Sequence, residues 1–273
     1  MLNFDFRTIV AYIRIMSKTT KTTMYLLKRI APLFILVFSV SFASAQVVGG
    51  MNFKMEKLFM EEKYEDVAYK GEKMIESDKY KKDPEIYLYI AMAWYEISQM
   101  NDEEVEEEYP NALRDALKYA SKFAKKDKDG VWMEDNSEFF EDLKKAGIAD
   151  AAQWIGDERK MRNAVSGYKY MTKAIPDDYN LLFFKGVLEH MNRNEGQADR
   201  DIAEAMNGLI PLYEQERYRP SKASAPVLED GLLRWTDIMI EKSYADSAKK
   251  TINWALQFFP ESEKVKEKAE SLK

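Results

Sequence analysis

The sequence predicts an all-α fold built from repeated helical hairpins. Residues of high helix propensity dominate the chain, whereas Gly accounts for only 11 of 273 residues and runs of β-branched residues are scarce. Hydrophobic residues make up 46% and charged residues 32%, which is typical of a folded protein and not of a disordered one. A pattern of small and large residues also returns at a fixed interval along the chain, which indicates a repeat protein.

The first element, residues 24–45, has the pattern of a secretory signal peptide. Basic Lys28 and Arg29 precede an apolar core from Ile30 to Val40, and small residues follow up to Ala45. This order predicts cleavage after Ala45. A transmembrane anchor is the alternative, but the apolar run is shorter than the ~20 residues that a membrane span requires.

Residues 1–23 precede this signal, and we expect them to be an upstream extension or a misassigned start, with translation beginning at Met16 or Met24. The remaining chain, 46–273, carries 35 Lys and Arg against 46 Asp and Glu, a net charge of −11. Such an acidic protein is a poor ligand for nucleic acid or an anionic membrane. The signal resembles those of the Bacteroidota, so we expect a periplasmic or secreted protein with no transmembrane span after cleavage.

The clearest repeat lies in the second helix of each predicted hairpin, where a small residue is followed by others at spacings of four and three. The first two copies are 34 residues apart, and the third is 50 away from the second because a loop of 16 residues, 213–228, is inserted. A proline is expected to close each of these helices. The three copies and their prolines are Ala164, Tyr168, Met171 and Pro176; Ala198, Ile202, Ala205 and Pro211; Ala248, Ile252, Ala255 and Pro260.

The first helix of each hairpin shows spacings of 3, 4 and 7, which place its apolar residues on one face. We expect the small residues of both helices to let neighbouring backbones approach closely, while bulky residues fill the gaps between hairpins. The residues expected on the first helices are Ile148, Ala151, Ala152 and Ile155, then Leu232, Trp235, Thr236 and Met239; the small residues expected at close approaches are Ala152, Ala164, Gly186, Ala198 and Ala248.

A unit of 34 residues with this order of large and small positions resembles the tetratricopeptide repeat (TPR) family. The resemblance implies a right-handed superhelical solenoid of about five TPR-like hairpins within residues 46–273. Lys185 and Glu189 occupy positions that the family fills with apolar residues, which leaves the register of the fourth unit open. The expected units are 48–83, 84–127, 145–178, 179–212 and 229–262, closed by a capping helix at 263–273.

The resemblance also implies where a ligand would bind, because the first helices of TPR hairpins line a concave groove. An aromatic and aliphatic floor edged by acids suits a protein or peptide segment with some basic character. The candidate residues are Leu88, Met92, Tyr95, Glu96, Gln153, Asp157, Phe183, Val187, His190, Leu233, Asp237 and Glu241.

Several kinds of chemistry are excluded by composition. The chain has no Cys, so it forms no disulfide and no Cys-ligated zinc site, and its single His, His190, cannot build an all-His metal cage within one chain. The segment Lys126–Gly130 hints at a calcium loop, but Lys125 and Asn136 stand where ligands are needed. The acidic segment Asp102–Glu108 is expected to be a solvated loop. We therefore expect no catalytic residue, no metal and no cofactor.

The sequence thus favours an exported, non-catalytic scaffold or adaptor that binds protein segments in the cell envelope. One alternative is a glycan- or nutrient-binding component of the periplasm or outer membrane. Another is an enzyme built on a helical toroid or solenoid, which a bound metal or a tight cluster of buried carboxylates would favour. Fold alone does not decide among these functions.

Overall fold

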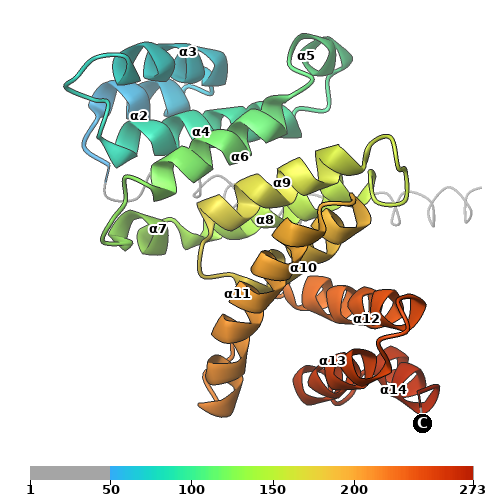
Figure 1. Ribbon diagram of the computed structural model, residues 1–273. Helices are drawn as coiled ribbons and strands as arrows, with labels where there is room; N and C mark the ends of the chain where they lie inside the picture. Colours follow the sequence, from blue (N-terminus) through green and yellow to red (C-terminus); the bar gives the residue numbers. More distant parts are fainter. Residues whose placement is uncertain (1–49, 273) are drawn as a thin grey trace, which may run out of the picture. The chain divides into compact units, whose positions relative to one another are not determined.

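The computed structural model describes residues 50–272, and this part of the chain is all-helical, as the sequence predicts (Figure 1). The predicted signal peptide and the residues before it lie outside the described residues. Between residues 50 and 272, no helix is both long and apolar enough to cross a membrane. The helices are α2 (Phe53–Met60), α3 (Tyr64–Ile75), α4 (Pro84–Gln99), α5 (Glu103–Glu108), α6 (Ala112–Ala124), α7 (Val131–Asp135), α8 (Ser137–Ala152), α9 (Met161–Ala174), α10 (Tyr179–Met191), α11 (Glu195–Glu214), α12 (Ala225–Glu241), α13 (Ala245–Phe258) and α14 (Glu263–Glu270).

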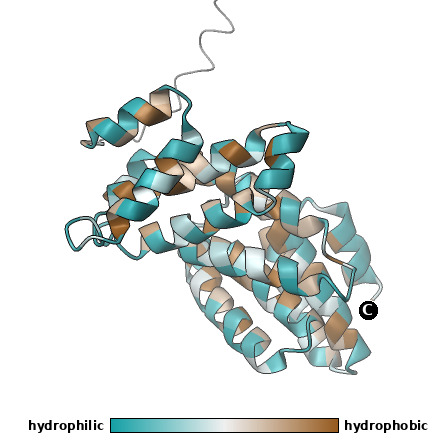
Figure 2. Ribbon diagram, turned by 90° about the horizontal axis from the view of Figure 1, so that it is seen from above, coloured by the Kyte–Doolittle hydropathy of each residue, from teal (hydrophilic) through white to brown (hydrophobic). Residues whose placement is uncertain are grey.

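The longer helices pack in pairs that follow the chain. The pairs are α2 with α3, α4 with α6, α8 with α9, α10 with α11, and α12 with α13, and α14 packs against α13. Neighbouring pairs meet where α3 contacts α4, α6 contacts α9, and α10 contacts both α9 and α12. Most helices carry hydrophobic and hydrophilic residues on the same turn (Figure 2), so each has an apolar face to bury against its neighbours.

Small residues stand where helices approach closely. Ala164, Ala198 and Ala248 are all buried, as expected from the repeat. A Cβ atom added to Gly186 would lie 2.6 Å from the Ile202 side chain and 3.1 Å from the Ile202 backbone nitrogen, so only glycine lets α10 and α11 come this near. The absence of a side chain at Gly186 therefore sets the distance between these two helices.

The close approach of α8 to α9 involves Gly147 and Ala151, and not the predicted Ala152. Ala152 was expected at a helix contact, but it is exposed, whereas Ala151 is fully buried. A Cβ atom at Gly147 would lie 2.7 Å from the sulfur of Met171 on α9. Gly147 and Ala151 are four residues apart and share one helix face, so the contact face of α8 is shifted by one residue from the prediction.

Three hairpins turn with the same backbone conformation. The second residue after the end of α2, of α10 and of α12 has a left-handed backbone conformation. Its φ is 56° at Glu62, 65° at Arg193 and 62° at Ser243. The following residue then donates its N–H five residues back, which is the Schellman arrangement that closes a helix. These bonds join Lys63 N to Leu58 O at 3.0 Å, Asn194 N to Glu189 O at 2.8 Å, and Tyr244 N to Met239 O at 2.8 Å.

Several helix boundaries differ from those expected. The helix α8 begins at Ser137, eight residues before the expected start of the unit at 145. The acidic segment contains α5, where the Asp102 carboxylate accepts the Glu104 N–H at 2.9 Å and starts the helix. Pro211 was expected to close a helix, but it lies inside α11, which continues to Glu214.

The inserted segment 213–228 is held to the neighbouring hairpins by buried polar contacts. Lys144 of α8 is buried, and its Nζ lies 2.9 Å from Ser221 Oγ and 3.0 Å from Asp178 Oδ2. The Tyr218 hydroxyl donates to Asn180 Oδ1 at 3.0 Å. Because these partners lie 34 to 77 residues apart in sequence, the contacts tie the insertion to α8 and to the start of α10.

The two charged residues that break the family pattern on α10 are both buried and both paired. Lys185 Nζ forms an ion pair with Asp201 of α11, and the side chains of the two residues are only 9% and 5% exposed. Gln197 Nε2 donates to the second Asp201 oxygen at 2.8 Å. Glu189 accepts from Asn194 Nδ2 at 2.8 Å. The expected register of α10 is therefore compatible with its charges, because each has a polar partner on the adjoining segment.

Replacing Lys185 alone by Met should destabilise the protein by about 3–5 kcal/mol, because Asp201 would be left buried without its cation. The double variant Lys185→Met with Asp201→Leu should recover most of that loss, since it removes both charges from the apolar contact. Urea unfolding of the wild type and of both variants measures the difference. A double variant no more stable than the single one would contradict this account of the pair.

Candidate functional site

Four of the predicted groove residues lie in the core. Leu88, Phe183 and Val187 are 0% exposed and Met92 is 4% exposed. The cause is that α4 packs between α3 and α6, and α10 packs among α9, α11 and α12, so both helices are buried on nearly every side. A partner on the protein surface does not reach these four side chains, and the prediction that they line an open groove is corrected accordingly.

Two other candidates, Tyr95 and Glu96, are half-buried at the C-terminal half of α4. The Tyr95 ring meets Phe139 edge-on, with 5.8 Å between ring centroids. Burial, together with Asp142, raises the pKa of Tyr95 above its usual value. Burial and the nearby Glu62 raise the pKa of Glu96 as well. These residues thus present a partly desolvated acid beside an aromatic ring.

The candidates from the later helices are more accessible. Gln153 and Asp157 are exposed in the turn after α8, and the Asp157 carboxylate accepts the Arg159 N–H at 3.0 Å. On α12, Asp237 and Glu241 are exposed, and Leu233 is half-buried. Residues 233, 237 and 241 are four apart, so they share one helix face. Asp237 is already ion-paired with Lys268 of α14, whereas Glu241 forms no ion pair within the described residues.

His190, the last of the twelve candidates, lies where α10, α11 and α12 meet. Its ring meets Trp235 edge-on at 5.3 Å between centroids, and its Nε2 is 3.6 Å from a carboxylate oxygen of Glu195. The same oxygen accepts from Lys242 Nζ at 2.8 Å. Burial, followed by the charge of Lys242, lowers the pKa of His190, while Glu195 opposes that shift. His190 is therefore neutral at neutral pH and packs as an aromatic ring.

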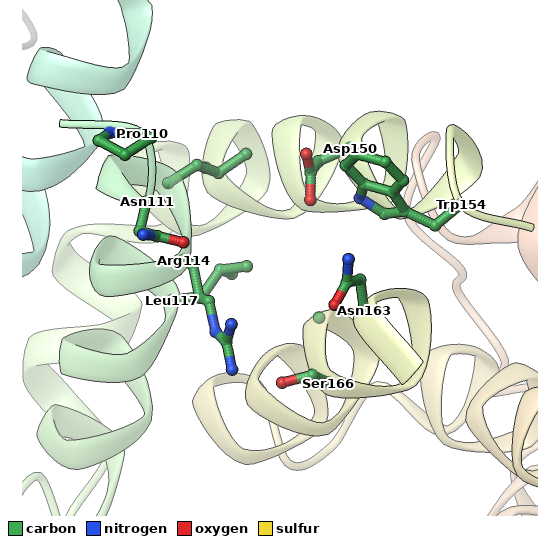
Figure 3. A pocket seen from close by; sticks show the side chains of 10 residues that line it. Pro110, Asn111, Arg114, Leu117, Asp150, Trp154, Asn163 and Ser166 are labelled. Atoms are coloured by element: carbon green, nitrogen blue, oxygen red, sulfur yellow. The ribbon is translucent and has the colours of Figure 1, made fainter. Parts of the chain in front are cut away.

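Sequence reasoning missed a cavity of about 140 Å³ between α6, α8 and α9 (Figure 3). The apolar part of its wall includes Leu113 and Leu117, and the Trp154 indole lies at one side. Five polar side chains also line it, and none of them forms a hydrogen bond or ion pair with another described residue. These five are Asn111, Arg114, Asp150, Asn163 and Ser166. No sequence motif marks them, because they come from three helices.

Figure 3 shows how the polar groups divide around this cavity. The Asp150 carboxylate lies beside the Trp154 ring on the α8 side, whereas the Arg114 guanidinium reaches toward Ser166 on the α9 side. The Asn163 amide points into the space between them. The cavity therefore presents a cation and an anion at different walls.

Metal binding has no support in the described residues. Between residues 50 and 272, no group of three or more His, Asp or Glu side chains is placed to hold a metal ion. In the segment that hinted at a calcium loop, the Asp127 carboxylate instead accepts the Met133 N–H at 2.8 Å, and Gly130 takes a φ of 72° at the start of α7. This segment is a turn that begins a helix.

Lowering the pH from about 7.5 to about 5.5 should destabilise the wild type more than the His190→Gln variant. The pKa of His190 is lowered in the folded protein, so the unfolded chain binds the proton more readily below its ordinary value of 6.5. The stabilisation that neutral His190 provides is fully present above pH 6.5, and it is lost as the pH falls toward the pKa of His190 in the folded protein. His190 is the only His in the chain, so urea unfolding at the two pH values isolates its effect. Equal pH dependence in both proteins would contradict this burial.

Comparison of the chain with protein-family models, with curated proteins and with solved structures finds no match. The geometry of the described residues is therefore the basis on which a function is assigned.

Proposed function

We propose that the protein is an exported, non-catalytic scaffold of TPR type, and that it binds protein or peptide segments in the bacterial cell envelope. In this proposal residues 24–45 are the signal peptide, residues 46–273 form a right-handed solenoid of about five hairpins with α14 as its cap, and the mature protein is periplasmic or secreted. The likeness of the signal to those of the Bacteroidota supports an envelope with two membranes.

The observation that carries the proposal is the repeated turn. Arg193 and Ser243 take the same left-handed conformation, and they are 50 residues apart, the interval that separates Ala198 from Ala248. Backbone geometry and the pattern of small residues thus repeat with the same offset, although the side chains at the two turns differ. A chain of similar hairpins, each packed on the next, is the architecture that provides extended binding surfaces.

The exposed acids indicate the kind of partner. The mature chain has a net charge of −11, and Glu241 extends into solvent from a helix face that also carries Leu233. Tyr95 and Glu96 add an aromatic ring and a second acid on α4. An apolar contact beside unpaired carboxylates suits a segment that carries Lys or Arg next to apolar side chains. In this proposal these accessible residues of α4 and of α12 take the place of the buried members of the groove that the sequence suggested.

A photo-crosslinking residue placed at Glu241 tests the proposal in the native cells. It should capture one or two envelope proteins in stoichiometric amounts, identified by mass spectrometry, and the charge reversal Glu241→Lys should weaken their recovery. The matched control is the same crosslinker at Glu204, an exposed acid on α11. Equal capture from Glu204, or no protein above background from Glu241, would count against the scaffold. Capture of a glycan instead would favour the carbohydrate-binding alternative.

A further inference from the structure

The cavity between α6, α8 and α9 is independent of the surface proposed for protein partners. It combines a cation, an anion, two amides and a hydroxyl, and no contact within the described residues uses these groups. Charged side chains at a surface normally face water or pair locally, as Lys118 does with Asp115 one turn along α6, at 3.0 Å. Arg114 is exposed and Asp150 is half-buried, and neither forms such a local pair within the described residues, yet both line the same hollow.

We propose that this cavity binds a small zwitterion, and specifically a free α-amino acid. The ligand carboxylate pairs with Arg114, whose planar guanidinium matches a carboxylate with two parallel hydrogen bonds. The ligand ammonium pairs with Asp150. A ligand with only one charge would satisfy one of these side chains and meet the like charge of the other.

The remaining groups fit the rest of such a ligand. Asn163 and Ser166 supply further donors and acceptors on the α9 side, and Asn111 has its amide free because it forms no side-chain capping bond at the start of α6. Leu113 and Leu117 provide the apolar wall against which a short side chain would pack. Recognition of a small ligand by an apolar wall and a few placed polar groups is the usual arrangement of such sites.

The size of the cavity restricts the ligand. A volume of about 140 Å³ is below the roughly 300–1,000 Å³ of pockets that hold drug-sized ligands, so one small molecule fills this one. A sugar ring would need a free aromatic face for stacking. The Trp154 ring already has the Lys160 ammonium over it, 4.9 Å from the ring centroid. The contacts therefore favour an amino acid over a carbohydrate.

Isothermal titration calorimetry of the purified protein with each of the standard L-amino acids tests the site. At least one small amino acid should bind in a 1:1 complex. The variants Arg114→Gln and Asp150→Asn should each weaken it by about tenfold or more, since each removes one hydrogen-bonded charge. The matched controls Arg162→Gln and Asp129→Asn change exposed residues of the same types that do not line the cavity, and both should bind as the wild type does.

Probes that carry a single charge or none separate the possible recognition modes. Acetate, ethylamine and glucose should bind far more weakly than the amino acid, because each lacks at least one of the two charges. Equal binding of any of these probes, equal binding by the Arg114 or Asp150 variants, or no binding of any amino acid would overturn the proposal. None of these results bears on partner capture at Glu241. If the cavity binds no amino acid, the scaffold proposal is unaffected and is decided by the crosslinking experiment alone.

Discussion

The close approach of α10 to α11 at Gly186 is the constraint on which much of the structure depends. Without a side chain at this position, Ile202 packs directly against the α10 backbone, and the buried pair of Lys185 and Asp201 can form beside it. Gly147 permits a similar contact between α8 and α9. Interiors are packed as densely as crystals, so a methyl group added at such a contact must displace the atoms that it meets.

This packing also decides where the protein can bind a ligand. The central helices α4 and α10 are enclosed by their neighbours, so the side chains that a sequence pattern places on their groove faces are used for the core. The solvent-accessible polar and charged side chains that could bind a ligand therefore lie at helix ends, in turns and on the outer face of α12. Both proposals follow from this division, because the acidic surface at Glu241 and the cavity beside Arg114 lie where helices end or face solvent.

Much of the fold could be predicted from the sequence. Helical spacing and the recurring alanines identified the paired helices, and Gly186, Ala164, Ala198 and Ala248 are buried as expected. The left-handed turn at Arg193 could not be foreseen, because no glycine marks it. The burial of Leu88 and the cavity beside Arg114 escaped prediction for another reason: both depend on how three or more helices meet, and periodicity along one helix carries no such information.

Paired alanine substitutions test most directly whether close approach at glycine sets the helix positions. In Gly167→Ala the new Cβ lies 3.8 Å from its nearest neighbour, an ordinary contact, so removing a glycine from the interior of α9 should stabilise the protein by about 0.5–1 kcal/mol. In Gly186→Ala the same change should cost about 1–3 kcal/mol, because the Ile202 backbone must shift. Urea unfolding of both variants gives the two values. Opposite signs are the predicted result, and a stabilised Gly186→Ala variant would contradict the account.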